Sequence, residues 1–504
     1  MSGAHRRVPT ELWNEILDTF PLYPGSDDLK NFALVCRSFL PIARSFLFSD
    51  LHLAPFLIHS DRVLLPPSNV VDSRLERIDF CCSPEIAPLV QCFTIFPDRR
   101  LSIKAPDPSE WAESETPDVL LDALFERLDR FTGLRKLVIR YIQFTQSRVD
   151  IIRHLPNLRQ LDVVRCPAVP EQLISVPPRS LSITTLKLWH NDDTLADNFW
   201  YDYVQPDQLR VIEADFRHGG ALSITQIPIF PHVQKLWVSM GENQPSYYHA
   251  ILSKFPAVRS VRVVSQGPET NNIRTSAILP ALEEYYGGIQ PLPLFLAAES
   301  LHRVQISSVR PEHLIARFHG GLGGRITALN VDLTMLSIQI FRDLVEQLPE
   351  LRELLIRHRT KLRVMFTEKI SYKRIPPDLV LDGRAQGYYK VRAGFKPSEF
   401  FLALANVPFL PPTLERLVIL YDYLPSLGSF SFDIPCGYTV SDFPKMRDDL
   451  VARCPGLNYL WLHGIYFRYA WRDGGNEFSA RNYMDSYVQF AEPFYDDPRW
   501  KSDL

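Results

Sequence analysis

One pattern of apolar and polar residues recurs along most of the chain. It consists of an apolar residue, two others, a second apolar residue, one other and a third apolar residue, as in Leu134-Arg-Lys-Leu137-Val-Ile139. The central apolar residues of the first six copies, Leu137, Leu161, Leu186, Ile212, Leu236 and Val261, lie 24, 25, 26, 24 and 25 residues apart. Copies occupy 134–139, 158–163, 183–188, 209–214, 233–238, 258–263, 282–285, 301–306, 326–331, 351–356, 414–419 and 457–462.

Each copy predicts a short strand, because alternating apolar and polar residues place the apolar side chains on one face. The rest of each period returns the chain to the start of the next strand, and each unit buries its apolar face by stacking on its neighbours. Period and pattern resemble irregular leucine-rich repeats, which span about 20–29 residues. The resemblance implies an α/β solenoid, a curved parallel sheet with helices outside. The resemblance implies one position in each repeat that holds Asn or Cys. Only Cys166 and Asn191 fall at that position here, so the ladder of such residues is absent and we expect irregular curvature.

The N-terminal residues predict three short amphipathic helices. Pro9 suits the first turn of a helix, where a backbone N–H has no partner to lose, and the apolar residues that follow recur at helical spacing. A second helix surrounds Leu29, and a third runs through Ile42 and Phe46. Three helices of this length make a poor core alone, so their apolar face needs a partner. As an alternative, the helices cap the domain behind them.

The order of these residues resembles the F-box, in its form common in fungal proteins. The matching residues are Val8-Pro9, Glu11, Ile16-Leu17, Asp28-Leu29, Val35-Cys36-Arg37, Phe39 and Phe48, with Val8 where Leu is usual. The resemblance implies docking to a Skp-type adaptor, and through it to a cullin, in an SCF-type ubiquitin ligase. The residues that it assigns to the adaptor contact are Pro9, Leu12, Ile16, Leu17, Leu29, Leu34, Val35, Cys36 and Phe39.

The two patterns divide the chain into four parts. Residues 1–52 are the predicted F-box, and 53–125 form a connecting region with early irregular repeats, in which Leu75-Glu-Arg-Ile78-Asp-Phe80 resembles one repeat. Residues 126–465 are the predicted solenoid, with insertions at 359–411 and 421–447. Residues 466–504 form an aromatic tail that we expect to cap the last repeat, with ligand docking as the alternative.

Composition excludes several classes of function. The net charge is −3, so there is no basic excess for nucleic acid. Seven cysteines without C-x-x-C spacing predict buried free thiols rather than disulfides or zinc. We find no phosphate-binding, nucleophile-elbow or zinc-protease motif, and we interpret the glycines of 319–324 as a turn between repeats. We therefore expect no catalytic residues, no cofactor and no metal.

No apolar run is long enough for a bilayer and no signal peptide is present, which predicts a cytoplasmic or nuclear protein without membrane contact.

The repeat phase also predicts a binding face. Residues flanking the central apolar residue of a strand point to the concave side, and aromatic and arginine side chains supply most interface energy. The predicted target contacts are Trp189, Asp215, Trp237, Arg262, Tyr286, Arg357 and Trp461. An equal alternative is that the tryptophans pack under the insertions or the tail.

These features favour a substrate-recognition adaptor of an SCF-type ubiquitin ligase, with the F-box on the adaptor and the repeats on an unidentified protein target. The alternative is a leucine-rich-repeat scaffold for protein–protein interaction with no role in ubiquitination.

Overall fold

The computed structural model describes part of the chain. It describes residues 40–59, 62–65, 68–97, 112–113, 118–166, 179–189, 194–215, 227–240, 245–265, 278–319, 322–360, 381–382, 390–391, 400, 403–404, 410–423, 442–463, 468–474 and 478–480. The chain divides into two compact units, Met1–Val258 and Arg259–Leu504 (units 1 and 2), each of which is treated by itself.

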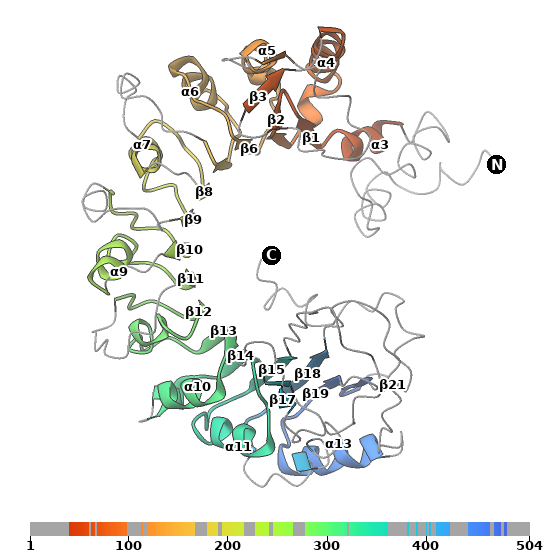
Figure 1. The fold of residues 1–504 in the computed structure, drawn as a ribbon, viewed down its shortest axis with the longest axis vertical. Helices are drawn as coiled ribbons and strands as arrows, with labels where there is room; N and C mark the ends of the chain where they lie inside the picture. Colours follow the sequence, from red (N-terminus) through yellow and green to blue (C-terminus); the bar gives the residue numbers. More distant parts are fainter. Residues whose placement is uncertain are drawn as a thin grey trace, which may run out of the picture. The chain divides into compact units, whose positions relative to one another are not determined.

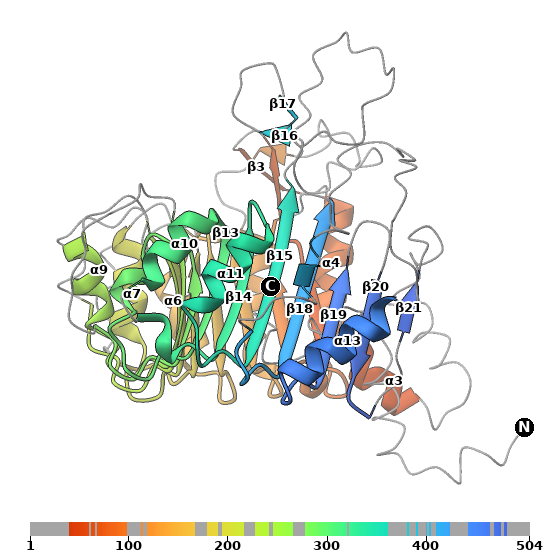
Figure 2. The same cartoon turned by 90° about the horizontal axis from the view of Figure 1, so that it is seen from below.

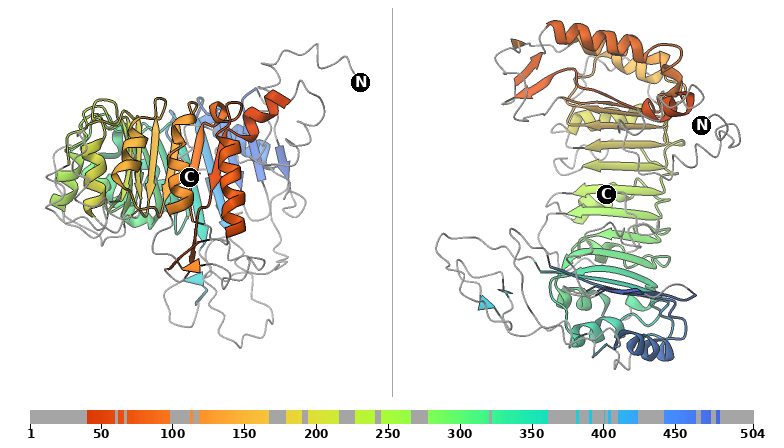
Figure 3. Two further views of the ribbon diagram at one scale, coloured as in Figure 1. Left: turned by 90° about the horizontal axis from the view of Figure 1, so that it is seen from above. Right: turned by 90° about the vertical axis from the view of Figure 1, so that its right-hand side faces the viewer.

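Unit 1 is built on a parallel sheet. Its strands follow the order β1 (Asp50–Leu53), β4 (Cys92–Ile95), β6 (Lys136–Arg140), β7 (Gln160–Val164), β8 (Thr185–Trp189), β9 (Val211–Asp215) and β10 (Lys235–Met240). Each strand is parallel to the one before it. They run side by side in the right-hand view of Figure 3. A separate small sheet joins β2 (Leu57–His59), β3 (Arg62–Leu65) and β5 (Ala112–Glu113).

Helices precede, separate and follow the strands of unit 1 along the chain. They are α3 (Leu40–Leu47), α4 (Ser68–Cys81), α5 (Asp118–Phe125), α6 (Gln146–Arg153), α7 (Thr194–Tyr203) and α9 (Pro245–Leu252), with single 3-10 turns at Ala87–Leu89 and Leu128–Arg130. Helices α5, α6, α7 and α9 lie on one face of the sheet (Figure 1). We call the opposite face the open face of the unit.

Unit 2 repeats this plan and ends differently. Its strands follow the order β11 (Ser260–Ser265), β12 (Glu284–Gly287), β13 (Arg303–Val309), β14 (Ala328–Leu333), β15 (Glu353–Thr360), β18 (Arg416–Tyr423), β19 (Tyr459–His463), β20 (Arg468–Arg472) and β21 (Phe478–Ala480). They are parallel as far as β19, and β20 and β21 then pair antiparallel. Among the described strands, β16 (Leu381–Asp382) and β17 (Lys390–Val391) form a two-stranded antiparallel sheet of their own.

Helices α10 (Pro311–Phe318), α11 (Ile338–Glu346) and α13 (Asp442–Arg453) cover one face of this sheet (Figure 2), and we again call the other face open. Single 3-10 turns lie at Leu292–Leu294 and Leu322–Arg325. The second turn contains Gly323, where a Cβ would lie 2.3 Å from the carbonyl oxygen of Gln347. That glycine allows close approach of two chain segments before β14, as expected of a turn between repeats.

The predicted strands are confirmed. Each of the twelve copies of the pattern contributes a strand, and each strand begins two residues after the first apolar residue of its copy. Within each unit, the residue before a repeat strand also donates its backbone N–H to the carbonyl oxygen of its counterpart one repeat earlier, as where Thr184 N donates to Arg159 O (2.8 Å) and Arg210 N to Thr184 O (2.8 Å). Despite the insertion between them, β15 and β18 are direct neighbours, and Glu415 N donates to Arg352 O (2.8 Å).

The repeat predicted at 75–80 is wrong, because these residues lie in α4. Ile78 is buried and Phe80 is 55% exposed. Residues three apart, such as Leu75 and Ile78, share one face of a helix, whereas residues five apart, such as Leu75 and Phe80, do not. The spacing of Leu75 and Ile78 therefore fits a helix as well as the repeat pattern. The actual neighbours of β6 in this region are β4 and then β1, neither of which follows the pattern.

The described cysteines are free thiols, as predicted. They are Cys81, Cys82, Cys92, Cys166 and Cys454, of which all but Cys92 are buried. Cys166, at the repeat position noted above, lies with its Sγ 3.6 Å from the carbonyl oxygens of Ile139 and Val164. Burial raises the pKa of this thiol to about 12, which suits a structural rather than a reactive group.

Candidate protein-binding faces of the two units

The predicted target contacts all belong to open-face positions of the sheet. In unit 1 these are Trp189, Asp215 and Trp237, on β8, β9 and β10. Their neighbours along each strand, such as Leu188, Ala214 and Leu236, are at most 2% exposed in the core. In unit 2 the contacts are Arg262, Tyr286, Arg357 and Trp461, on β11, β12, β15 and β19. Because side chains alternate between the faces of a strand, each predicted residue lies opposite the core.

Trp189 and Trp237 form an aromatic pair in unit 1. Their ring centroids are 5.1 Å apart and the ring planes meet at 79°, the edge-to-face arrangement that aromatic pairs prefer. Both side chains are half-buried. The pair is therefore a large, partly exposed apolar surface on a sheet face that otherwise carries mostly polar residues.

Charged residues surround this pair on the same face. Lys187 Nζ lies 2.7 Å from Glu213 Oε1, and Lys136 Nζ lies 3.9 Å from Asp162 Oδ2. Gln160 Nε2 donates to Asp162 at 2.9 Å. Burial nevertheless raises the pKa of Asp162, because desolvation outweighs these favourable contacts.

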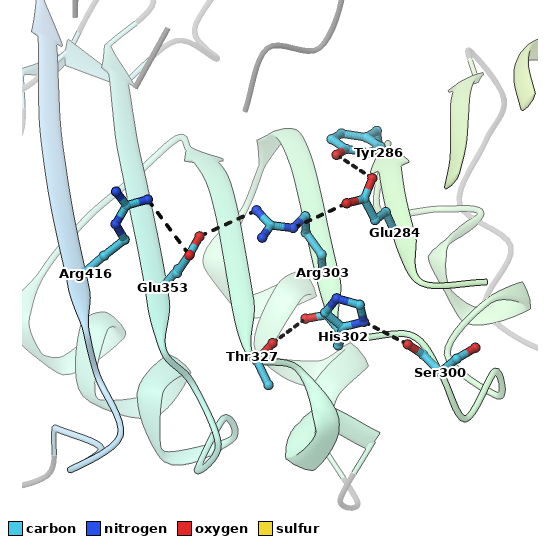
Figure 4. A network of polar contacts seen from close by, with 8 residues as sticks. All are labelled: Glu284, Tyr286, Ser300, His302, Arg303, Thr327, Glu353 and Arg416. Atoms are coloured by element: carbon cyan, nitrogen blue, oxygen red, sulfur yellow. Dashed lines mark hydrogen bonds and ion pairs between the residues drawn. The ribbon is translucent and has the colours of Figure 1, made fainter. Parts of the chain in front are cut away.

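A row of ion pairs crosses the open face of unit 2 (Figure 4). Arg303 on β13 contacts Glu284 on β12 through Nε (3.5 Å to Oε1) and Glu353 on β15 through Nη1 (3.5 Å to Oε2). Arg416 on β18 reaches the other oxygen of Glu353 at 4.0 Å, and Tyr286 Oη donates to Glu284 Oε2 at 3.0 Å. Burial and the Glu284 carboxylate raise the pKa of Tyr286, which keeps this hydroxyl a donor.

The register explains how two of these residues meet across an intervening strand. Glu284, Arg303, Ala328, Glu353 and Arg416 stand directly opposite one another on five successive strands. The side chain of Ala328 is short, so the Arg303 side chain extends across it to Glu353. Ala328 is accordingly only 2% exposed. The sequence-based prediction missed this row, although the residues share one repeat position. An alignment of successive repeats would have revealed their alternating charges.

Farther along β15, Arg357 is ion-paired and its neighbour His358 is buried and neutral. Arg357 Nη1 lies 3.5 Å from Asp332 Oδ1 on β14, and both side chains are largely buried. The next residue, His358, is buried, and desolvation lowers the pKa of its imidazole to about 4. His358 is therefore neutral at physiological pH.

One part of the open face of unit 2 is apolar and buried. Its cluster joins strands β14, β15, β18 and β19 and consists of Ala328, Leu355, Val418, Leu420, Tyr459 and Trp461, with Ala470 of β20 packed against it. Trp461 is 6% exposed. Of the two interpretations that the sequence left open for this tryptophan, the structure favours packing, so Trp461 contributes little to the surface that a partner could reach.

The predicted adaptor contacts lie outside the described residues. Pro9, Leu12, Ile16, Leu17, Leu29, Leu34, Val35, Cys36 and Phe39 all precede Leu40, where the described chain begins. The helix predicted third is present as α3, with Ile42 and Ala43 buried.

The described residues show neither a metal site nor a membrane span. No group of three or more His, Cys, Asp or Glu side chains among them could hold a metal ion. Within the same residues, no helix is both long and apolar enough to cross a membrane. A scan of protein-family models and a search of curated proteins found no match to this chain.

Proposed function

We propose that this chain is a substrate-recognition adaptor of an SCF-type ubiquitin ligase. In this proposal residues 1–52 form an F-box that binds a Skp-type adaptor, and the strands belong to leucine-rich repeats that hold a protein target. The chain would promote ubiquitination by proximity alone, by holding the target near the ubiquitin-loaded enzyme.

The observation that carries the proposal is the firm connection between α3 and the sheet. At the end of α3, Phe48 N donates to Arg44 O (3.0 Å), and the Phe48 ring lies 5.9 Å from the Phe80 ring of α4. The next residue, Ser49, accepts hydrogen bonds at its carbonyl from Gln91 N (2.8 Å) and Cys92 N (2.9 Å) at the start of β4. In the sequence, the F-box-like motif overlaps this helix, because the last residue that matches the motif is Phe48. A proximity mechanism needs such a connection, because a loose linker would not orient the target.

The open faces supply the second half of the proposal. Parallel sheets are usually covered on both faces, and the described helices cover one face of each unit. On the face that carries no described helix, the strands hold an aromatic pair and ion-paired side chains, which suits recognition of another protein better than chemistry on a small molecule.

The test is capture of the full-length chain on an immobilised, purified Skp-type adaptor. We expect wild type to bind and a Leu17→Glu, Leu29→Glu double variant to lose binding, because two charges would enter the apolar contact. The matched control is Val119→Glu with Met335→Glu, which places the same two charges at residues that are 60% and 55% exposed. No capture of a folded wild type would overturn the proposal and favour a scaffold without a ubiquitin role.

A further inference from the structure

We infer that the Trp189–Trp237 pair and two exposed cations that flank it bind an acidic, extended segment of a protein partner. The cations are Arg140 and Lys235, and the segment places an apolar side chain on the rings and carboxylates beside the cations. This inference rests on the target-binding half of the proposed function and does not need the adaptor half. It concerns unit 1 alone, where the residues involved lie on strands β6 to β10.

The two indole rings lean toward each other across a strand. Trp189 is on β8 and Trp237 is on β10, with β9 between them. Neighbouring strands lie about 4.8 Å apart, so the two backbones are separated by roughly twice that distance. The ring centroids are only 5.1 Å apart, and both side chains are half-buried. The pair therefore bridges β9 and presents a partly exposed aromatic surface.

The carboxylates of this face are buried. Asp162, Glu213 and Asp215 are 8%, 7% and 7% exposed. Two of them also have a cation beside them, because Asp162 pairs with Lys136 and Glu213 pairs with Lys187. A partner that approaches these strands therefore meets little negative charge.

The accessible charge on the same face is positive. The open-face positions of β6 to β10 hold three carboxylates and four cations, a formal charge of +1, and the cations are Lys136, Arg140, Lys187 and Lys235. Arg140 and Lys235 are exposed, and neither forms an ion pair with another described residue. Lys136 keeps 41% of its side chain exposed despite its pairing. Arg165, exposed just after β7, adds a further positive charge. This surface attracts an acidic segment and repels a basic one.

The register places the two exposed cations on different sides of the rings. Arg140 stands in one row with Val164 and Trp189, so it is two strands, or about 10 Å, from Trp189. Lys235 precedes Trp237 by two residues on β10, about 7 Å along the strand. An extended chain advances about 3.3 Å per residue. Carboxylates about two to four residues on either side of an apolar side chain would therefore reach both cations.

The rings and the cations have different effects on binding. An apolar side chain packed on the indoles excludes water, and buried tryptophans supply much of the binding energy at interfaces. Exposed ion pairs add little affinity, but charges at the rim steer association and reject partners of like charge. The guanidinium of Arg140 can also hold a carboxylate by two parallel hydrogen bonds. Together these groups favour an acidic segment with one apolar anchor.

The experiment selects binders for the full-length wild-type chain from a random peptide library displayed on phage. Peptides that bind the immobilised Trp237→Ala chain are removed first, so that binders of other surfaces of the chain are discarded. We expect wild type to enrich sequences in which aspartate or glutamate lies about two to four residues from an apolar residue. Enrichment of basic or uncharged sequences, or no enrichment at all, would overturn the inference.

The dissociation constant of one selected, fluorescently labelled peptide is then measured by anisotropy. Trp189→Ala, which plays no part in the selection, should weaken binding about tenfold or more. The Arg140→Gln, Lys235→Gln double variant should weaken binding about threefold to tenfold at low salt. Its difference from wild type should shrink as sodium chloride is added, because salt screens exposed charges.

A matched control removes the same kinds of charge elsewhere in unit 1. Arg130→Gln with Lys254→Gln changes one arginine and one lysine that lie in turns outside the strands, and it should leave the affinity unchanged. Circular dichroism shows that each variant is folded. Unchanged affinity in Trp189→Ala or in the Arg140→Gln, Lys235→Gln variant would overturn the inference, as would an equal loss in the control.

The same measurements separate this inference from the proposed function. The Leu17→Glu, Leu29→Glu double variant should bind the selected peptide as wild type does. If wild type holds the peptide but does not bind the Skp-type adaptor, the ubiquitin role fails and the acidic-segment site stands. If it binds the adaptor and selects no acidic peptide, the opposite holds.

Discussion

Two tryptophans at the same repeat position have different surroundings. Trp237 and Trp461 each follow the central apolar residue of their copy, so alternation predicts the same sheet face for both, and the structure agrees. Trp237 is half-buried beside Trp189, whereas Trp461 is buried in an apolar cluster. Alternation identifies the side of a sheet on which a residue lies. Because it does not reveal how much of that side is buried, the pattern alone predicts a target contact at Trp461 as well as at Trp237.

The difference predicts unequal costs of truncation. Trp461→Ala should lower the free energy of unfolding by about 3–5 kcal/mol, because it leaves a cavity in a packed cluster. Trp237→Ala should lower it by about 1–2 kcal/mol, because its ring is partly in water already. Urea denaturation followed by circular dichroism measures both values, and equal losses would contradict this view of the two sites.

His358 predicts a specific loss of stability in acid. Its pKa of about 4 in the folded chain is below the ordinary value of 6.5. The unfolded chain therefore takes up a proton first as the pH falls, which favours unfolding. The stabilisation is complete above pH 6.5 and declines toward pH 4, by about 3 kcal/mol in total.

The measurement compares urea denaturation of wild type and of His358→Gln from pH 8 to pH 4. Taking the difference between the two proteins removes the titration of every other group. The difference should change over this interval, with wild type losing more stability than the variant. Parallel curves would contradict the shifted pKa.

At the scale of elements, periodicity was a strong guide for strands and a weak one for the helices before them. Twelve strands were predicted, because an apolar pattern repeated at an even period is typical of strands stacked in a solenoid. Helix α4 was mistaken for a repeat because a single copy with a three-residue gap fits both a strand and a helix. The ion-pair row was missed because its members are one or two repeats apart and meet across Ala328, a relation that no single repeat displays.

The row predicts that the same substitution has different costs at two nearby glutamates. Glu353 is 9% exposed and lies between Arg303 and Arg416, so Glu353→Gln should destabilise the chain by about 1–3 kcal/mol by leaving two arginines without its charge. Glu415 pairs with Arg352 at 3.7 Å with both side chains exposed, and Glu415→Gln should cost about 0–0.5 kcal/mol. Chemical denaturation of the two variants provides the comparison, and a cost at Glu415 as large as that at Glu353 would contradict it.

At the scale of the whole molecule, the sequence predicted the class of fold and could not predict the content of the open faces. Strand order follows the chain from β6 to β10 in unit 1 and from β11 to β15 in unit 2, where it continues to β18 past a long insertion, as the spacing of the copies required. The composition of the open faces depends on which side chains meet across strands, and this became visible only in three dimensions. The assignment of residues 1–52 to an F-box remains a prediction.

The most direct test of the central claim is assembly of the ligase from purified parts. Full-length chain, Skp-type adaptor and cullin are mixed and separated by size-exclusion chromatography with mass determination. The account predicts one complex that contains all three, that needs the adaptor to join the chain to the cullin, and that the Leu17→Glu, Leu29→Glu variant does not enter. A folded wild-type chain that elutes apart from the adaptor and cullin would contradict the account.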